Sequence, residues 1–165
     1  MESARPARPE DLPRIAELAA AVIEELTPMR GGEIWARQTA RSLPVDGELA
    51  SALDDPDQLL VVGEVDGTTI GYAAVRIERL RDGGALAVLD DLYVEPDARG
   101  VGVGEAMMDQ VVEWATAQGC IGIDSVALPG NRATKNFFES FGLVARAIVV
   151  HRPLAPEVDT GEGPV

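Results

Sequence analysis

The chain contains very little of several residue types on which common functions depend. Its 165 residues include one cysteine, Cys120, one histidine, His151, and one lysine, Lys135. A lone cysteine excludes an internal disulfide and is typical of the reducing cytoplasm. Because no further cysteine or histidine lies at metal-ligand spacing, the sequence predicts no zinc site.

Long apolar runs and positive charge are scarce as well. No apolar run approaches the roughly 18 residues that a membrane span requires, and residues 1–10 lack the apolar core of a secretory signal. The formal net charge is −14 at pH 7, which argues against a nucleic-acid partner, because phosphate binding depends on clustered Lys and Arg. The sequence therefore predicts a cytoplasmic protein with neither a membrane nor a nucleic-acid partner. Its acidity either serves solubility or attracts a cationic acceptor.

The length predicts a single domain, which the patterning assigns to residues 1–154. Residues 155–165 are acidic and rich in Pro and Gly, and are predicted to be disordered. Apolar periodicity and turn residues predict the elements of the domain. The predicted helices cover 11–26, parts of 31–53, 103–118 and 132–141, and the predicted strands cover 1–8, 58–65, 68–77, 85–94, 121–128 and 143–152.

The most informative feature present is the stretch 99–104, RGVGVG, between a predicted strand and a predicted helix. Glycines at such a turn leave backbone N–H groups uncovered, and a helix N-terminus adds partial positive charge. The turn therefore predicts an anion site, most naturally for phosphate. It is not a nucleoside-triphosphatase loop, because Glu105 and Ala106 stand where Lys and Ser or Thr are required. It also lacks the glycine spacing of the dinucleotide fingerprint.

The order strand, loop, helix, strand from residue 85 to 128 has a topological consequence. A crossover helix normally returns the chain parallel to its start. We therefore expect the strand at 89–94 to run parallel to, and beside, the strand at 123–128.

Two motifs carry a resemblance to a known family. Arg99, Gly102 and Gly104, preceded by LYVEPDA, resemble the coenzyme-A pyrophosphate loop of the Gcn5-related N-acetyltransferase (GNAT) family. The stretch NRATKNFFESFGL, from Asn131, resembles the C-terminal motif of that family: an Asn, an aromatic residue seven positions on, then Gly and a hydrophobic residue. The motifs occur in the family's order, with a helix and a strand between them. The resemblance extends more loosely over residues 5–154.

The resemblance implies the GNAT fold, an α/β (α+β) fold with a mixed, mostly antiparallel sheet of about six to seven strands and about four flanking helices. Two parallel strands splay apart in this fold, and the pantetheine arm of the co-substrate acetyl-CoA pairs with a strand edge in the gap. Lys135 either reaches a coenzyme-A phosphate or is simply solvated. The residues that the resemblance assigns to coenzyme A are Leu92, Tyr93, Val94, Arg99, Gly100, Val101, Gly102, Val103, Gly104, Asn131, Lys135 and Phe138.

Acetyl transfer to an alkyl amine requires a base, because an amine with a pKa of about 10.4 is almost fully protonated at neutral pH. Asp90 and Asp91 are the candidates, and strand alternation would place them on opposite faces, so that only one faces the cleft. Polyamine-acetylating relatives carry an acidic residue at the position of Asp90, which favours Asp90. The backbone N–H of Val94 is the candidate for polarising the thioester oxygen.

The chain departs from the family where the leaving thiolate is protonated. Many members carry a Tyr seven positions after the Asn, and here that position is Phe138, which has no proton to donate. A thiol has a pKa of roughly 8.5, so a thiolate leaves tolerably even when only water protonates it. Tyr72 and Tyr93 are the two tyrosines of the chain, and each either substitutes as the acid or packs within the sheet.

These observations predict an acetyl-CoA-dependent N-acetyltransferase that moves an acetyl group directly to a primary amine of a small acceptor, such as a polyamine or an aminoglycoside-like cation. A protein N-terminal or lysine acetyltransferase is one alternative. A non-catalytic acyl-CoA-binding or sensing domain is another. A homodimer is compatible with the sequence, which names neither the acceptor nor the acyl chain length.

Overall fold

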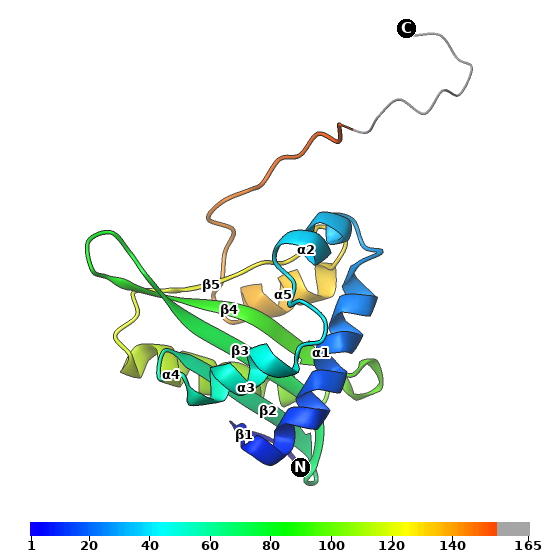
Figure 1. The fold of residues 1–165 in the computed structure, drawn as a ribbon, viewed down its shortest axis with the longest axis vertical. Helices are drawn as coiled ribbons and strands as arrows, with labels where there is room; N and C mark the ends of the chain where they lie inside the picture. The colour runs from blue at the N-terminus through cyan, green and yellow to red at the C-terminus, as the bar shows by residue number, and fades with distance from the viewer. Residues whose placement is uncertain (155–165) are drawn as a thin grey trace, which may run out of the picture.

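A mixed sheet of five strands in the order β1-β2-β3-β4-β5 forms the centre of the structure, a computed structural model that describes residues 1–154 (Figure 1). The pairs β1–β2, β2–β3 and β3–β4 are antiparallel, and the pair β4–β5 is parallel. The strands are β1 (Glu2–Pro6), β2 (Gln58–Val65), β3 (Thr68–Arg79), β4 (Ala85–Val94) and β5 (Ile123–Ser125). The tail 155–165, predicted to be disordered, lies outside the described residues.

Helices cover both faces of this sheet. Helices α1 and α3 pack on one face, and α4 and α5 pack on the other, while α2 lies beside α1 (Figure 1). The helices are α1 (Leu12–Leu26), α2 (Gly32–Gln38), α3 (Asp46–Asp54), α4 (Val103–Ala117) and α5 (Arg132–Ser140), with short 3-10 helices η1 (Pro9–Asp11) and η2 (Pro96–Ala98).

The central strands are apolar on both sides because each side faces a helical layer. Along β2, Leu60 and Val62 point into the core beneath α1, and Val61 points into the core beneath α4. Gly63, which follows Val62 in β2, lets α4 approach closely. A Cβ atom at this position would lie 2.4 Å from Cγ1 of Val103. Helix α4, which begins at the glycine loop, is thereby held directly against the sheet.

The predicted crossover is confirmed in direction and shifted in register. Strand β5 pairs with β4 over Ala87–Leu89, opposite Ile123–Ser125. Residues 90–94 of β4 therefore continue beyond the last paired residue of β5. The two strands part where the resemblance implies a splayed pair.

The predicted strand at 143–152 is wrong for the described chain, and the sheet has five strands rather than six or seven. After α5, residues 143–154 form no helix or strand. Their β-branched composition favours a strand, but a strand needs a partner edge, and within residues 1–154 this segment pairs with none. The predicted strand 121–128 is likewise shortened to Ile123–Ser125.

Candidate active site

A β-bulge in β4 shapes the candidate site. Ala74 of β3 lies opposite Asp91, and the next residue, Val75, lies opposite Leu89, so Asp90 has no partner in β3. The extra residue reverses the alternation of β4: Leu89 belongs to the core beneath α4, and Tyr93 to the core beneath α1. The expectation that Asp90 and Asp91 face opposite sides is therefore wrong, because alternation holds only in a regular strand.

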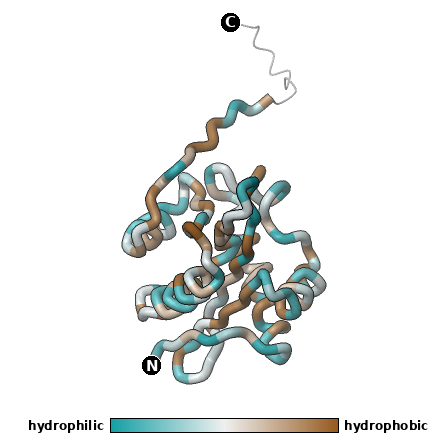
Figure 2. The backbone as a smooth tube through the Cα atoms, turned by 90° about the vertical axis from the view of Figure 1, so that its left-hand side faces the viewer, coloured by the Kyte–Doolittle hydropathy of each residue, from teal (hydrophilic) through white to brown (hydrophobic). Residues whose placement is uncertain are grey.

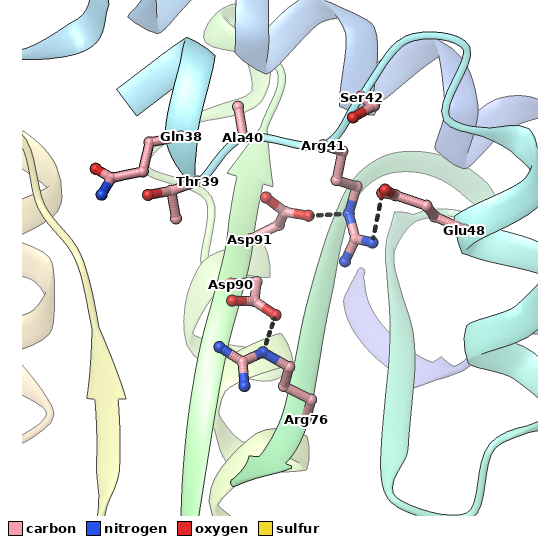
Figure 3. A pocket seen from close by; sticks show the side chains of 9 residues that line it. All are labelled: Gln38, Thr39, Ala40, Arg41, Ser42, Glu48, Arg76, Asp90 and Asp91. Atoms are coloured by element: carbon pink, nitrogen blue, oxygen red, sulfur yellow. Dashed lines mark hydrogen bonds and ion pairs between the residues drawn. The ribbon is translucent and has the colours of Figure 1, made fainter. Parts of the chain in front are cut away.

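Both aspartates line one cleft of about 440 Å³ (Figure 3). The wall opposite β4 is formed by residues 38–42, at the end of α2 and the start of its connection to α3, and by Glu48 of α3. Arg76 of β3 completes the charged lining. Three carboxylates thus meet two guanidinium groups in a single cleft.

Arg41 joins the connection between α2 and α3 to the bulge. Its Nε donates to Asp91 at 2.6 Å, and its Nη1 lies 3.6 Å from a carboxylate oxygen of Glu48. The side chains of Arg41 and Asp91 are only 14% and 8% exposed. Burial alone would lower the pKa of Arg41, but the nearby Asp91 charge and its hydrogen bond raise it overall. The pair is a buried ion pair that fixes the cleft wall.

Tyr72 lies beneath this pair. Its ring belongs to the core beneath α1, and its hydroxyl is buried without a hydrogen-bond partner among the described residues. Burial, and secondly the negative charge of Asp91, raise the pKa of Tyr72 well above its ordinary value. Tyr72 is therefore held neutral behind Asp91, and its side chain does not line the cleft of about 440 Å³.

Asp90 has a different environment from its neighbour. Its carboxylate accepts from Nε of Arg76 at 3.0 Å, on the more accessible side of the cleft (Figure 3). Burial, the largest cause, raises the pKa of Asp90, and the Asp91 charge adds to this, while Arg76 opposes it. A carboxylate with a raised pKa is a stronger base than an ordinary aspartate, as proton abstraction from an ammonium group requires.

The free edge of β4 follows the bulge. The N–H of Glu95 donates to the carbonyl of Ile70 on β3 at 2.9 Å, and N–H groups alternate in direction along a strand. The N–H groups of Leu92 and Val94 therefore point away from β3, towards the side where pairing with β5 has already stopped at Leu89. These donors face an open edge.

The glycine loop presents its backbone. Gly100 and Gly102 have φ angles of +87° and +92°, in the left-handed region that favours glycine, and Gly102 is the N-cap of α4. No backbone oxygen within residues 1–154 accepts a hydrogen bond from the N–H of Gly100, Val101 or Gly102. Val103 differs from the rest of the loop because its side chain is buried in the core.

Arg99, which the resemblance assigns to coenzyme A, turns back towards α1. Its Nε donates to the carbonyl of Val94 at 2.9 Å, and its Nη2 lies 2.8 Å from a carboxylate oxygen of Glu25. The guanidinium also lies over the Tyr93 ring, 5.5 Å from its centroid. The loop's backbone N–H groups therefore remain as donors without a partner within residues 1–154, whereas the Nε and Nη2 groups of Arg99 are already bonded to Val94 and Glu25.

The C-terminal motif has a clear structural role. Asn131 caps α5, its side chain accepting from the N–H of Thr134 at 3.4 Å. Phe138 is buried in the core beneath α4. Lys135 is exposed and lies 3.5 Å from Glu139 one turn on.

Sequence reasoning missed Arg41, Glu48 and Arg76. Arg41 lies 50 positions from its partner Asp91, in a connection that carries no recognisable motif. Only the bulge brings the partners together, and bulges leave little trace in a sequence. The only signal for this cleft in the sequence was the pair of adjacent aspartates, Asp90 and Asp91, within an otherwise apolar strand.

Within 1–154, no helix is both long and apolar enough to cross a membrane. Nor do these residues contain a group of three or more His, Cys, Asp or Glu side chains that could hold a metal ion.

Comparison with known proteins gives a family match. The model of the Acetyltransferase (GNAT) family matches residues 19–143. Aminoglycoside N(6')-acetyltransferase type 1 of Klebsiella aerogenes is 29% identical over 111 residues, which cover 64% of this chain and 73% of that protein. Glucosamine 6-phosphate N-acetyltransferase of Trypanosoma brucei brucei is 28% identical over 139 residues, covering 79% of this chain and 92% of that protein.

Solved structures share the fold. AAC(6')-Iy, in complex with the bisubstrate analog CoA-S-monomethyl-acetylneamine, has a TM-score of 0.70 at 20% identity, covering 94% of this chain and 99% of that one. Glucosamine-6-phosphate N-acetyltransferase from Arabidopsis thaliana has a TM-score of 0.68 at 18% identity, with coverages of 94% and 99%. At these identities the likeness concerns the fold.

Proposed function

Because the chain belongs to the acetyltransferase (GNAT) family, we propose that it transfers the acetyl group of acetyl-CoA directly to a primary amine of a small cationic acceptor bound in the cleft. The observation that carries this proposal is the bulge in β4. It brings Asp90 and Asp91 to one cleft of about 440 Å³, just before the free edge of the same strand. A base and a cofactor-binding edge thus belong to one strand.

Coenzyme A fits the glycine loop and the strand edge. Its pyrophosphate would accept hydrogen bonds from backbone N–H groups of residues 100–105, where the N-terminus of α4 adds partial positive charge. The amides of its pantetheine arm would pair with Leu92 and Val94, as an added strand does. Gly104, in the first turn of α4, packs against α5: a Cβ atom there would lie 3.2 Å from the Phe137 ring.

The other residues of the predicted cofactor site support this path indirectly. Tyr93 and Arg99 stack at the end of β4 and tie it to α1. Asn131 begins α5, which places Phe137 against the loop, and Phe138 anchors α5 in the core. Lys135, on the exposed side of that helix, supplies a mobile positive charge for the coenzyme-A phosphates.

The reaction requires one proton acceptor and one oxyanion donor. Asp90, directly or through a water molecule, takes a proton from the acceptor ammonium, and the neutral nitrogen then attacks the thioester carbonyl carbon. The N–H of Val94 stabilises the oxyanion that forms. The C–S bond breaks and coenzyme A leaves as a thiolate. The second proton that the attacking nitrogen must lose passes through water to that thiolate, since Phe138 has no proton to donate. The products are the N-acetylated acceptor and free coenzyme A.

The charge of the cleft favours a cationic acceptor. Asp90, Asp91 and Glu48 outnumber Arg41 and Arg76, and both guanidinium groups already pair with these carboxylates. The Klebsiella aerogenes relative is named for aminoglycosides, which are polyamines built on sugars, and this supports an aminoglycoside-like acceptor.

A specific observation favours a second acceptor class. The Arg76 side chain is about half exposed at the cleft, where it would bind a phosphate on an amino sugar. The Trypanosoma brucei brucei relative is named for glucosamine 6-phosphate.

The test is steady-state release of free thiol from acetyl-CoA across a panel of amines. The panel contains aminoglycosides, spermidine, glucosamine, glucosamine 6-phosphate, and peptides with a free N-terminus or lysine. Turnover with aminoglycosides or spermidine, which carry several positive charges, but not with glucosamine or glucosamine 6-phosphate, is the expected result. Preference for glucosamine 6-phosphate over glucosamine would select the second class. Peptide turnover alone would indicate a protein acetyltransferase, and tight acetyl-CoA binding without turnover would indicate a sensing domain.

A further inference from the structure

The acceptor cleft is one positive charge short. Three carboxylates face two guanidinium groups there, and Arg76 is paired with Asp90. Arg41 therefore has to serve both of the other carboxylates. Its Nε donates to Asp91 at 2.6 Å, while its Nη1 lies 3.6 Å from Glu48, which is too far for a good hydrogen bond. One further cation is needed to give each carboxylate a partner of its own.

The two carboxylates that share Arg41 differ in exposure. The Asp91 side chain is 8% exposed, whereas that of Glu48 is 48% exposed. Arg41 belongs to residues 39–45, which lie between α2 and α3 and form no helix or strand. Because both carboxylates already lie within 3.6 Å of its guanidinium, a change of partner requires a shift of this side chain and not of the sheet.

Behind Asp91, the hydroxyl of Tyr72 has no partner. Tyr72 is 0% exposed, and no residue within 1–154 forms a hydrogen bond with its hydroxyl. It belongs to the core beneath α1, in the interior of the molecule, where hydrophobic residues gather (Figure 2). Tyr72, Arg41 and Asp91 line a narrow inner pocket that has no room for a water molecule. A buried hydroxyl without a partner is unfavourable, and Asp91 is the carboxylate that lines the same pocket.

We propose that Arg41 holds the place of an ammonium group of the acceptor. A second ammonium of the acceptor displaces the guanidinium from Asp91, Arg41 then pairs with Glu48, and the Tyr72 hydroxyl donates to Asp91. After this exchange each carboxylate has its own cation, and the buried hydroxyl has an acceptor. The inference rests on the proposed function, and it narrows the acceptor to amines with at least two ammonium groups, one for Asp90 and one for Asp91.

The first experiment is a calorimetric titration in the absence of acetyl-CoA, with spermidine as the probe and butylamine as the control that carries one ammonium group. Spermidine should bind more tightly than butylamine. Tyr72→Phe removes a hydroxyl that does not line the cleft, yet it should weaken spermidine binding about tenfold, because Asp91 loses the donor that it gains in the exchange. Butylamine binding should be the same in this variant and in the wild type.

Tyr72→Phe should not lower the melting temperature, because the hydroxyl has no partner in the free protein. Weaker spermidine binding therefore cannot come from a damaged fold. Thr116→Val is the control: it removes the hydroxyl of an exposed residue on α4, and it should leave the spermidine affinity unchanged. Equal spermidine affinities in Tyr72→Phe and the wild type overturn the inference.

The second experiment vacates the place. In Arg41→Met, Asp91 has lost its cation, and an ammonium of spermidine should replace it. Spermidine should therefore raise the melting temperature of Arg41→Met by more than it raises that of the wild type. Arg79→Met, which breaks an exposed ion pair outside the cleft, should show the wild-type increase.

Equal increases in Arg41→Met and the wild type overturn the inference, because spermidine then does not reach Asp91. Absence of spermidine binding to the wild type overturns it as well. Neither experiment measures turnover, so spermidine binding without acetyl transfer would count against the proposed reaction alone.

Discussion

The glycine loop and the acceptor cleft are built from different parts of the chain. The loop presents backbone N–H groups, and its shape depends on the left-handed φ angles of Gly100 and Gly102. The cleft presents side chains that are already paired with one another, Arg41 with Asp91 and Arg76 with Asp90. Six consecutive residues encode the first site. The cleft joins residues that are distant in the sequence: Arg41 and its partner Asp91 are 50 positions apart, and Arg76 and its partner Asp90 are 14 positions apart.

This difference determines how each region responds to substitution. In the cleft, removing one partner leaves the other charge unpaired, which affects both stability and chemistry. In the loop, adding a side chain blocks the approach of a ligand and leaves the packed core in place. The following variants test that contrast, beginning with the largest expected effect.

Arg41→Met should lower the free energy of unfolding by about 3 kcal/mol, because it leaves Asp91 buried without its cation. The matched control is Arg79→Met. Arg79 pairs with Asp57 at 3.5 Å and both side chains are more than half exposed, so the loss should stay below about 1 kcal/mol. Urea unfolding followed by circular dichroism gives both values. Equal losses in the two variants would show that the cleft pair is no more important than a surface pair.

Asp90→Asn should lower turnover by roughly 100-fold or more, the usual effect of removing a positioned base, and leave acetyl-CoA affinity unchanged. A base works only when deprotonated, so activity falls as the pH drops through its pKa. Because burial raises the pKa of Asp90, the acidic fall of wild-type kcat/KM should lie above the ordinary aspartate pKa of about 3.9. The Asn variant should lose this acidic limb.

Asp57→Asn serves as the control for Asp90, since Asp57 is an exposed aspartate that also pairs with an arginine. It should retain wild-type turnover. Full turnover in Asp90→Asn would instead assign the base to Asp91 or to water.

Gly104→Val should weaken acetyl-CoA binding about tenfold, because a branched side chain obstructs backbone approach to the pyrophosphate. The Phe137 ring, 3.2 Å from the added Cβ, must shift slightly. Gly47→Val is the control, since nothing lies within 4 Å of a Cβ on α3 at that position. Calorimetric titration with acetyl-CoA measures both. An unchanged affinity in Gly104→Val would separate the loop from cofactor binding.

Phe138→Tyr should change turnover by at most a few-fold. The added hydroxyl offers a proton to the departing thiolate, and any gain should appear where thiolate expulsion limits the rate. Phe138 is buried, so a melting temperature measured in parallel shows whether the hydroxyl finds a partner. No gain with an unchanged melting temperature would mean that water or Tyr93 already supplies the proton.

The sequence predicted what local chemistry determines. The helix over 11–26, the hairpin around Asp66 and Gly67, and the parallel return of β5 follow from periodicity, turn residues and crossover topology. The predicted strand at 143–152 was wrong: its residues favour a strand, but within residues 1–154 the segment pairs with no neighbouring strand. The prediction that Asp90 and Asp91 face opposite sides was wrong because one inserted residue reverses the alternation of β4. Pairings across many residues and single-residue insertions leave no periodic signal.

The solitary lysine has a practical use. Lys135 carries the only ε-amine of the chain, it is exposed, and it lies on the helix whose Phe137 borders Gly104 of the loop. A fluorophore that reacts with amines therefore reaches this position and the exposed α-amine of Met1, without any engineered residue. Its emission would report events at the neighbouring loop in the native sequence, and by mass spectrometry any acetylated lysine in this protein can be assigned to that residue without fragmentation.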